Sequence, residues 1–444
     1  MSKILKRGNK KLINAWAFYD WANSVYSLVI SSAIFPIYYT AVSAAAFKEG
    51  NVPDLLAGLS SESIINIVTA LGFLIVSVLS PLLSGVADYS GRKRAFLKVF
   101  CYLGSISCVL LAFFSFDYLY VSLSIYMLAL IGFWGSLVFY NSFLPDVAFP
   151  EQQDAVSAKG FSLGYIGSVL LLVLCLGLVQ GGFYPEEGLF SDSDVLRLDA
   201  VQLSFILVGL WWWGFAQYTY CYLPAGNVKE AQEGISIWNS GFLELKKIWF
   251  KLNENLQMKR YLGAFFIYSM AVQTVMIVAT YFGTTEVEWP EGESTQGLIV
   301  SILLIQLVAV LGAWIASKLS RKLGNINTLI IINIIWASIC VYGYFVVTPM
   351  QFYITAAAVG FVMGSIQSLS RSTYSKMIPE GATDTASYFS FYDVAEKVGI
   401  VLGLAIFIAV REQFDSMRYS ILFLLLFFVI GAILLMRVPR LKVD

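Results

Sequence analysis

The sequence contains no histidine, which removes the commonest metal ligand and the only side chain whose charge changes near neutral pH without perturbation. It has few cysteines, and these lie inside apolar runs without any C-x-x-C pair, so we expect buried, reduced thiols. They are Cys101, Cys108, Cys175, Cys221 and Cys340. The sequence also lacks a nucleophile elbow, a metal-ligand cluster and a nucleotide-binding loop. It therefore predicts neither a metal site nor a cofactor, and it disfavours an intramembrane enzyme or an ATP-driven pump.

Charged residues are scarce as well, at 13% of 444 residues, and acidic and basic side chains balance to a formal net charge of zero. A balanced chain offers no electrostatic attraction for nucleic acid, so no such partner is expected. Hydrophobic residues make up 58% of the chain, and the mean hydropathy is +0.73. A soluble domain carries about 25% charged residues. Most of this chain must therefore be solvated by lipid.

Long apolar segments are what the sequence does have. A helix needs about 20 apolar residues to cross the hydrocarbon core of a bilayer, and the segments that qualify predict an all-α integral membrane protein of about twelve spans. They lie near residues 15–44, 63–87, 95–116, 120–144, 156–180, 202–223, 260–283, 295–317, 326–347, 351–374, 386–410 and 417–438. In the polar stretch between the sixth and seventh, Trp238, Leu243 and Trp249 among lysines predict an amphipathic helix on the inner leaflet.

The distribution of basic residues predicts the orientation of these spans. If both termini are cytoplasmic, the outer segments carry only Lys48, Arg197, Arg411 and Arg418, while nearly all other Lys and Arg residues fall on the inner side. The positive-inside rule requires such a bias, and a missed or extra span would destroy it. We therefore expect a multi-pass protein of the cell inner membrane with both termini in the cytoplasm.

Short sequence matches recur in the two halves of the chain. Arg92-Lys93 recurs as Arg321-Lys322, and Pro150-Glu151 recurs as Pro379-Glu380 at the same offset. This repeat predicts three parts: an N-terminal six-helix bundle at 1–223, a cytoplasmic linker with the amphipathic helix at 224–259, and a C-terminal six-helix bundle at 260–444. Repeats in the same orientation are the plan of one large class of transporters, in which the substrate site lies between the halves.

One motif between the second and third spans is more specific. It has the pattern G-x-x-x-D-x-x-G-R-K-R, and its defined positions are Gly85, Asp88, Gly91, Arg92, Lys93 and Arg94. The glycines permit close helix approach and a tight turn, and the carboxylate with the basic cluster can latch neighbouring helix ends. The pattern resembles the signature of the major facilitator superfamily. The resemblance implies a major facilitator fold in which Asp88 and Arg92 act as a conformational gate that stabilises the outward-open state. In the second half only the basic pair is kept, so a second latch is not predicted.

Further segments resemble a narrower branch. They are Trp16–Ser24 in the first span, Phe139–Asp146 in the fourth, and Ser370–Ser372 and Phe391–Lys397 in the tenth and eleventh. Together they resemble the branch that contains fungal vacuolar amino-acid effluxers and their bacterial relatives, the "unknown major facilitator" family. The resemblance covers nearly the whole chain. It implies a secondary transporter that exports a small polar solute such as an amino acid. We expect the protein to work as a monomer.

Charged residues within the spans are the first candidates for the site, because polar groups in hydrocarbon are costly unless they face a cavity or protein interior. Asp393, Glu396 and Lys397 are spaced i, i+3 and i+4 and share one helical face. Lys397 lies about eleven residues, or roughly 16 Å, into its span, near the midplane. The cluster could bind a solute carboxylate or take part in coupling to a proton or cation; alternatively, Asp393 and Lys397 form a structural pair.

Other polar groups extend the candidate list. Asp20 could be a coupling carboxylate facing a cavity or could pack against a loop near the cytoplasmic end. Arg371 could pair with a solute carboxylate or with Asp393, or act as a positive-inside anchor. The amides at membrane depth could bind solute or join helices; they are Asn23, Asn141, Gln273 and Gln367.

Since the chain lacks histidine, any proton coupling would fall to carboxylates, with Asp20, Asp393 and Glu396 as the leading groups. The function that these observations favour is alternating-access transport of a small solute in the lipid bilayer. A lipid-moving or receptor-like protein that reuses the transporter fold stays open, because fold does not fix function.

Overall fold

The computed structural model describes residues 5–49, 53, 56, 58–180, 199–226, 237–414 and 416–439, and within these ranges it contains helices and no strand. The helices are α1 (Lys10–Val25), the π-helix η1 (Tyr26–Ile34), α2 (Phe35–Glu49), α3 (Ser61–Ser90), α4 (Lys93–Leu110), the short 3-10 helix η2 (Leu111–Phe113), α5 (Leu119–Ser142), α6 (Leu144–Val147), α7 (Pro150–Gln180), α8 (Ala200–Tyr222), α9 (Ile237–Glu254), α10 (Leu256–Thr285), α11 (Ser294–Leu323), α12 (Asn325–Tyr344), α13 (Pro349–Met377), α14 (Thr385–Phe414) and α15 (Met417–Met436).

Eleven helical segments in this part of the chain are long and apolar enough to cross a membrane. The first of them joins α1, η1 and α2 into one segment, Lys10–Lys48. The twelfth membrane helix is α14, which has 30 residues but whose apolar run is interrupted by charged side chains. The predicted all-α integral membrane fold is confirmed for the described residues.

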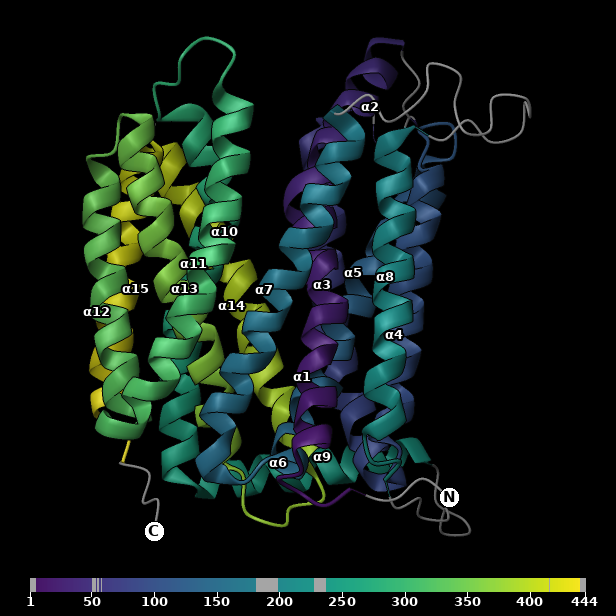
Figure 1. The fold of residues 1–444 in the computed structure, drawn as a ribbon, viewed down its shortest axis with the longest axis vertical. Coiled ribbons are helices and arrows are strands. Elements are labelled where there is room, and N and C mark those ends of the chain that lie inside the picture. Colours follow the sequence, from purple (N-terminus) through teal and green to yellow (C-terminus); the bar gives the residue numbers. More distant parts are fainter. Residues whose placement is uncertain are drawn as a thin grey trace.

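The helices form two halves that stand side by side, α1–α8 in one and α10–α15 in the other (Figure 1). Each half has its own hydrophobic core. The helix α1 begins and α15 ends at the same end of the bundle, which we call the terminal end (Figure 1). The halves meet where α14 packs on α3 and α5, and where α7 packs on α11 and α13. Toward the opposite end the helices of the two halves diverge (Figure 1).

Local sequence explains how several of these helices begin and end. The residue after α3 is Gly91, whose φ of 67° is a left-handed conformation that suits glycine, and the next N–H, that of Arg92, bonds to Ala87 O at 2.9 Å. At the start of α13, Thr348 and Gln351 form a capping box and Pro349 occupies the first turn, where its missing N–H costs nothing. The signature turn is thus built by its own residues.

The amphipathic linker helix is α9, which lies along the terminal end against α3, α10 and α14 (Figure 1). Gly85 of α3 and Gly241 of α9 allow close backbone approach, because a Cβ at Gly85 would overlap the Gly241 carbonyl. On the free side of α9, Phe242, Leu243 and Trp249 are exposed, as expected for a helix whose apolar side faces lipid. The helix therefore lies beneath the contact of the two halves.

Candidate functional site between the two halves

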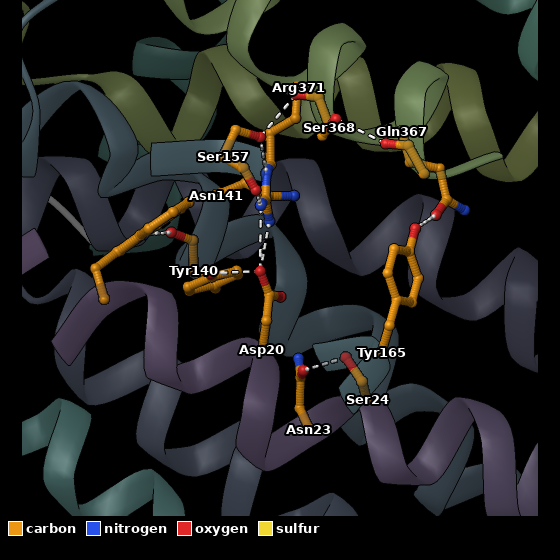
Figure 2. Close-up of polar contacts among 12 residues, drawn as sticks. Asp20, Asn23, Ser24, Tyr140, Asn141, Ser157, Tyr165, Gln367, Ser368 and Arg371 are labelled. Carbon is orange, nitrogen blue, oxygen red and sulfur yellow. Dashed lines mark hydrogen bonds and ion pairs between the residues drawn. The ribbon is translucent and has the colours of Figure 1, made fainter. Parts of the chain in front are cut away.

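An ion pair joins the halves deep in the bundle. Arg371 on α13 donates from Nη2 and Nη1 to Asp20 Oδ2 on α1, at 3.1 and 3.2 Å (Figure 2). Both side chains are buried, at 3% and 4% exposure of their residues. A buried ion pair needs further hydrogen bonds to offset the loss of water. The neighbouring residues supply them.

Hydrogen bonds from α5 and α7 complete this pair. Tyr140 OH donates to Asp20 Oδ2 at 2.8 Å. Arg371 donates from Nε to Ser157 Oγ at 2.9 Å, from Nη2 to Ser157 O at 3.0 Å, and from Nη1 to Asn141 Oδ1 at 3.3 Å. The guanidinium also lies over Phe161, 4.1 Å from the ring centroid, a favourable contact for a desolvated cation. The arginine is therefore held by residues of three helices.

Gly160 on α7 makes room for this arrangement. A Cβ at this position would overlap Asp20 Oδ2 and lie 3.0 Å from Arg371 Nη2. One turn along, Gly164 gives the same access to Ser24 of α1. The glycine face at 160–167 therefore packs closely against the polar side of α1. These glycines bring the carboxylate of Asp20 within reach of both halves.

Two further polar groups lie beside the ion pair (Figure 2). Tyr165 OH on α7 donates to Gln367 Oε1 on α13 at 2.7 Å, a second link between the halves. Asn23 is 1% exposed, and its Nδ2 has no hydrogen-bond partner within the described residues. Its Oδ1 has one weak contact, from Ser24 Oγ at 3.5 Å. A buried donor without a partner is unfavourable unless a ligand or water satisfies it.

A second cluster surrounds Lys397 on α14. The ammonium binds Asp393 in a short contact and Glu396 Oε2 at 3.1 Å. Gln273 Nε2 on α10 donates to Glu396 Oε1 at 2.8 Å. The cluster also touches the other half, because Ser80 Oγ on α3 donates to Asp393 Oδ2 at 3.0 Å. It thus lies across the contact between α3 and α14.

The signature motif lies at the terminal end and joins α3 to α14. Asp88 accepts from Ser387 N at 2.6 Å, from Ser387 Oγ at 2.7 Å and from Ala386 N at 3.3 Å. These donors belong to the first turn of α14, where a carboxylate is stabilised by free N–H groups and the helix dipole. Lys93 donates to Asp146 Oδ2 at 2.7 Å and to Thr385 Oγ1 at 2.6 Å.

Arg92 and Arg94 of the motif do not join the two halves. Arg94 donates from Nη1 to Leu223 O at 2.8 Å and so caps α8. Arg92 is the N-cap residue of α4. The latch between the halves is therefore formed by Asp88 and Lys93.

A second latch lies on the other side of the contact. Asp154 on α7 accepts from Ser320 Oγ at 2.8 Å, from Asn325 Nδ2 at 2.9 Å and from Lys376 Nζ at 2.7 Å. The acid belongs to the N-terminal half, and all three donors belong to the C-terminal half. The sequence motif did not predict this second latch, because the carboxylate is supplied by the opposite half rather than by the turn between α11 and α12.

The structure divides the nine candidate solute and coupling residues into the two clusters. Asp20, Asn23, Asn141, Gln367 and Arg371 lie in the first, and Gln273, Asp393, Glu396 and Lys397 in the second. Arg371 pairs with Asp20, so the suggested pair with Asp393 was wrong, as was a position of Asp20 against a loop.

Several contacting residues were not foreseen. They are Ser80, Trp134, Tyr140, Ser157, Phe161, Tyr165, Thr385 and Ser387. Each is an ordinary aromatic or hydroxyl residue of a membrane helix, and no spacing in the sequence distinguishes it. Tyr140 alone lies inside a segment that carried the family resemblance.

Comparisons with known proteins agree on the family. The model of the "Vacuole effluxer Atg22 like" family matches residues 8–443. The chain is 30% identical to the uncharacterized MFS-type transporter YxiO of Bacillus subtilis, over 98% of this chain and 96% of that one. It is 22% identical to Autophagy-related protein 22 of Coccidioides immitis, over 98% and 88% of the two chains.

Solved structures agree on the fold. The E. coli fucose:proton symporter FucP aligns with a TM-score of 0.67 at 14% identity, covering 97% of this chain and 98% of that one. The human organic anion transporter MFSD10 aligns with a TM-score of 0.68 at 11% identity, covering 97% and 100%. The chain therefore belongs to the vacuole effluxer Atg22-like family of major facilitator transporters, and it is a transporter rather than an enzyme.

Proposed function

We propose that this protein exports a small zwitterionic solute, an amino acid, by alternating access of a site between the two halves. The observation that carries the proposal is the buried pair of Asp20 and Arg371, which belong to different halves and present one negative and one positive group. An α-carboxylate matches the planar fork of the guanidinium, and an α-ammonium matches the carboxylate. A solute with both groups can replace each partner of the pair.

The surroundings of the pair support a solute with an apolar or weakly polar side chain. Phe161 and Trp16 flank the guanidinium, at 4.1 and 4.9 Å from their ring centroids. Asn23 offers an unused amide donor beside them. Pockets for small ligands commonly combine apolar walls with a few fixed polar groups. These features favour an amino acid over a sugar, which needs many hydrogen-bonding partners.

The two latches support the alternating-access mechanism. Asp88 and Asp154 hold the halves together at the terminal end. With both termini in the cytoplasm of the cell, as the positive-inside rule favours, this arrangement corresponds to a state that is closed toward the cytoplasm. The FucP structure described as the outward conformation aligns with a TM-score of 0.65. Opening both latches would then expose the site to the cytoplasm, where an exporter takes up its solute.

A thermal-shift screen of the purified protein with amino acids, sugars and drugs tests the solute class. We expect one or more amino acids to raise the melting temperature of the wild type, because a ligand that binds only the folded state stabilises it. Asp20→Asn and Arg371→Ala should lose this shift. Lys397→Ala should keep it if the second cluster serves coupling.

Transport itself is tested with proteoliposomes that are preloaded with a mixture of unlabelled amino acids and exposed to the same labelled mixture. Exchange of label by the wild type, and none by Asp20→Asn, would support the proposal. Stabilisation by sugars or lipids alone, or equal exchange by the Asp20 variant, would contradict it.

A further inference from the structure

The cluster around Lys397 is one positive charge short. Asp393 and Glu396 place two carboxylates against the single ammonium of Lys397. The Asp20–Arg371 pair, in contrast, is balanced by its own two members. An uncompensated charge within the membrane is unfavourable, so the Lys397 cluster has a physical reason to bind one more cation. We infer that Glu396 takes up and releases a coupling proton there, an inference that rests on the proposed transport function.

Geometry selects Glu396 over Asp393 as the proton-binding group. Asp393 is held by the short contact with Lys397 and by Ser80 Oγ at 3.0 Å, and its side chain is 5% exposed. Glu396 has the longer contact with Lys397, at 3.1 Å, and its side chain is 18% exposed. The glutamate is therefore the carboxylate less closely paired with Lys397 and the more exposed of the two.

No nearby charge replaces the missing one. From α10, the groups facing Glu396 are the amide of Gln273 and the phenol of Tyr268, and Tyr392 lies near it on α14 itself. Phenols and amides are uncharged at neutral pH. Packed from the other half, α3 contributes the hydroxyl of Ser80 and α5 the ring of Trp134, both of which contact the cluster.

Three basic residues of the surrounding helices are already paired elsewhere. Arg418 of α15 binds Glu286 Oε2 at 2.7 Å, and Lys251 of α9 binds Asp384 Oδ2 at 3.0 Å, at the terminal end. The charge of Arg371 is taken by Asp20. Within the described residues, no group of acidic, cysteine or histidine side chains is arranged to hold a metal ion. A proton, which needs only one carboxylate oxygen, fits the cluster best.

The position of the cluster explains how the proton would be coupled to the movement. Lys397 Nζ lies 4.2 Å from the ring centroid of Trp134 on α5, and Asp393 is bound by Ser80 on α3. Both contacts cross between the halves, so both change when the halves separate at the terminal end. A proton on Glu396 leaves Lys397 to Asp393 alone. The protonation of one residue therefore alters the balance of contacts that hold α14 against the other half.

The experiment compares Glu396→Gln with wild type in proteoliposomes under two regimes, using the labelled amino-acid mixture. Glutamine keeps the shape and the contact with Gln273 but cannot bind a proton. We expect Glu396→Gln to retain exchange without a gradient and to lose accumulation driven by an imposed pH gradient. The matched control is Glu412→Gln, an exposed position on the same helix, which should behave as wild type in both regimes.

A second readout needs no solute. In an infrared pH titration, the wild type should show the carbonyl band of a protonated carboxylic acid that Glu396→Gln lacks. Gradient-driven accumulation by Glu396→Gln, an unchanged infrared difference, or dependence on Na⁺ instead of pH would overturn the inference. Failure of the wild type to exchange any labelled amino acid, with the infrared band present, would instead overturn the proposed function.

Discussion

At the scale of single residues, the site depends on a position without a side chain. Gly160 faces Asp20 and Arg371 at a distance that leaves no space for a methyl group. The charged residues supply the functional groups of the site, but the glycine determines how closely α7 packs against them. This makes Gly160 a sharper probe of the site than either charge, since its replacement removes no functional group.

We predict that Gly160→Ala abolishes amino-acid exchange while the protein still folds. The new methyl group must displace the carboxylate of Asp20, and crowding of this kind costs about 1–3 kcal/mol. Exchange in proteoliposomes and the melting temperature are the two measurements. Gly177→Ala on the same helix is the control, because a Cβ there meets nothing within 4 Å. Exchange by Gly160→Ala at the level of this control would contradict the assigned site.

Arg371→Lys tests whether the fork of the guanidinium, rather than its charge, holds the solute. Lysine keeps the charge but cannot bind a carboxylate in two places or maintain the bonds to Ser157. Hydrogen bonds to charged groups contribute about 1.5–3 kcal/mol, so the affinity for the best amino acid should fall roughly 10- to 150-fold. Titration calorimetry provides the affinity, and Arg260→Lys at the surface serves as control. An affinity within error of wild type would show that only the charge matters.

The sequence identified both members of this pair singly but could not join them. Spacing along one helix predicts neighbours at i+3 and i+4, and it found Asp393, Glu396 and Lys397 in this way. Asp20 and Arg371 are 351 positions apart on different helices, and only the packing of two halves brings them together. The same reason explains why Ser157 and Tyr140 were missed.

At the scale of helices, the contact between the halves is secured at two places of opposite construction. Asp88 lies in the last turn of α3 and binds the first turn of α14 in the other half. Asp154 lies in the first turns of α7 and accepts hydrogen bonds from donors around the turn between α11 and α12. The signature motif predicted the first latch. It could not predict the second latch, because there the acid lies in the N-terminal half and its donors lie in the C-terminal half, outside any copy of the motif.

We predict that Asp88→Asn and Asp154→Asn each increase the population that is open at the terminal end. Each change removes charge-assisted hydrogen bonds, whose loss at about 1.5–3 kcal/mol shifts a two-state equilibrium roughly 10-fold or more. Distances between spin labels at Lys10 and Lys322, both exposed at this end, report the change. The exposed Cys221 is first replaced by serine so that labelling is specific.

The control for this measurement is Glu151→Gln, which removes an exposed carboxylate from the same first turns of α7. It should leave the distance distribution unchanged. Distributions of both aspartate variants that match the control would show that these contacts do not determine the conformation.

At the scale of the whole molecule, hydropathy and charge together predicted the fold. Within the part of the chain that the structure describes, hydropathy finds eleven apolar membrane helices, while α14 carries charges that weaken its signal. Counting α14 as a span agrees with the internal repeat and keeps most basic residues on the inner side of the membrane. The sequence did not predict the boundaries within the first span, because the composition of the π-helical segment Tyr26–Ile34 is not distinctive.

The predicted orientation of the molecule can be tested with fusions of a fluorescent protein that matures only in the cytoplasm. We expect fluorescence from fusions at both ends of the chain, since the positive-inside rule places the basic segments there. An insertion after Gly292, in the exposed turn between α10 and α11, should stay dark. Fluorescence at one end of the chain alone would require an odd number of spans and would contradict the two-half architecture.

The pairing of Asp20 with Arg371 also bears on what happens after the cargo has left. In this closed state the two side chains neutralise each other with nothing bound between them, so we expect the unloaded protein to return without a bare ion in the hydrocarbon. A carrier whose empty site holds a lone charge is restricted to exchanging one solute for another. Under the transport function that we propose, the paired site removes this restriction, and we expect net export as well as exchange.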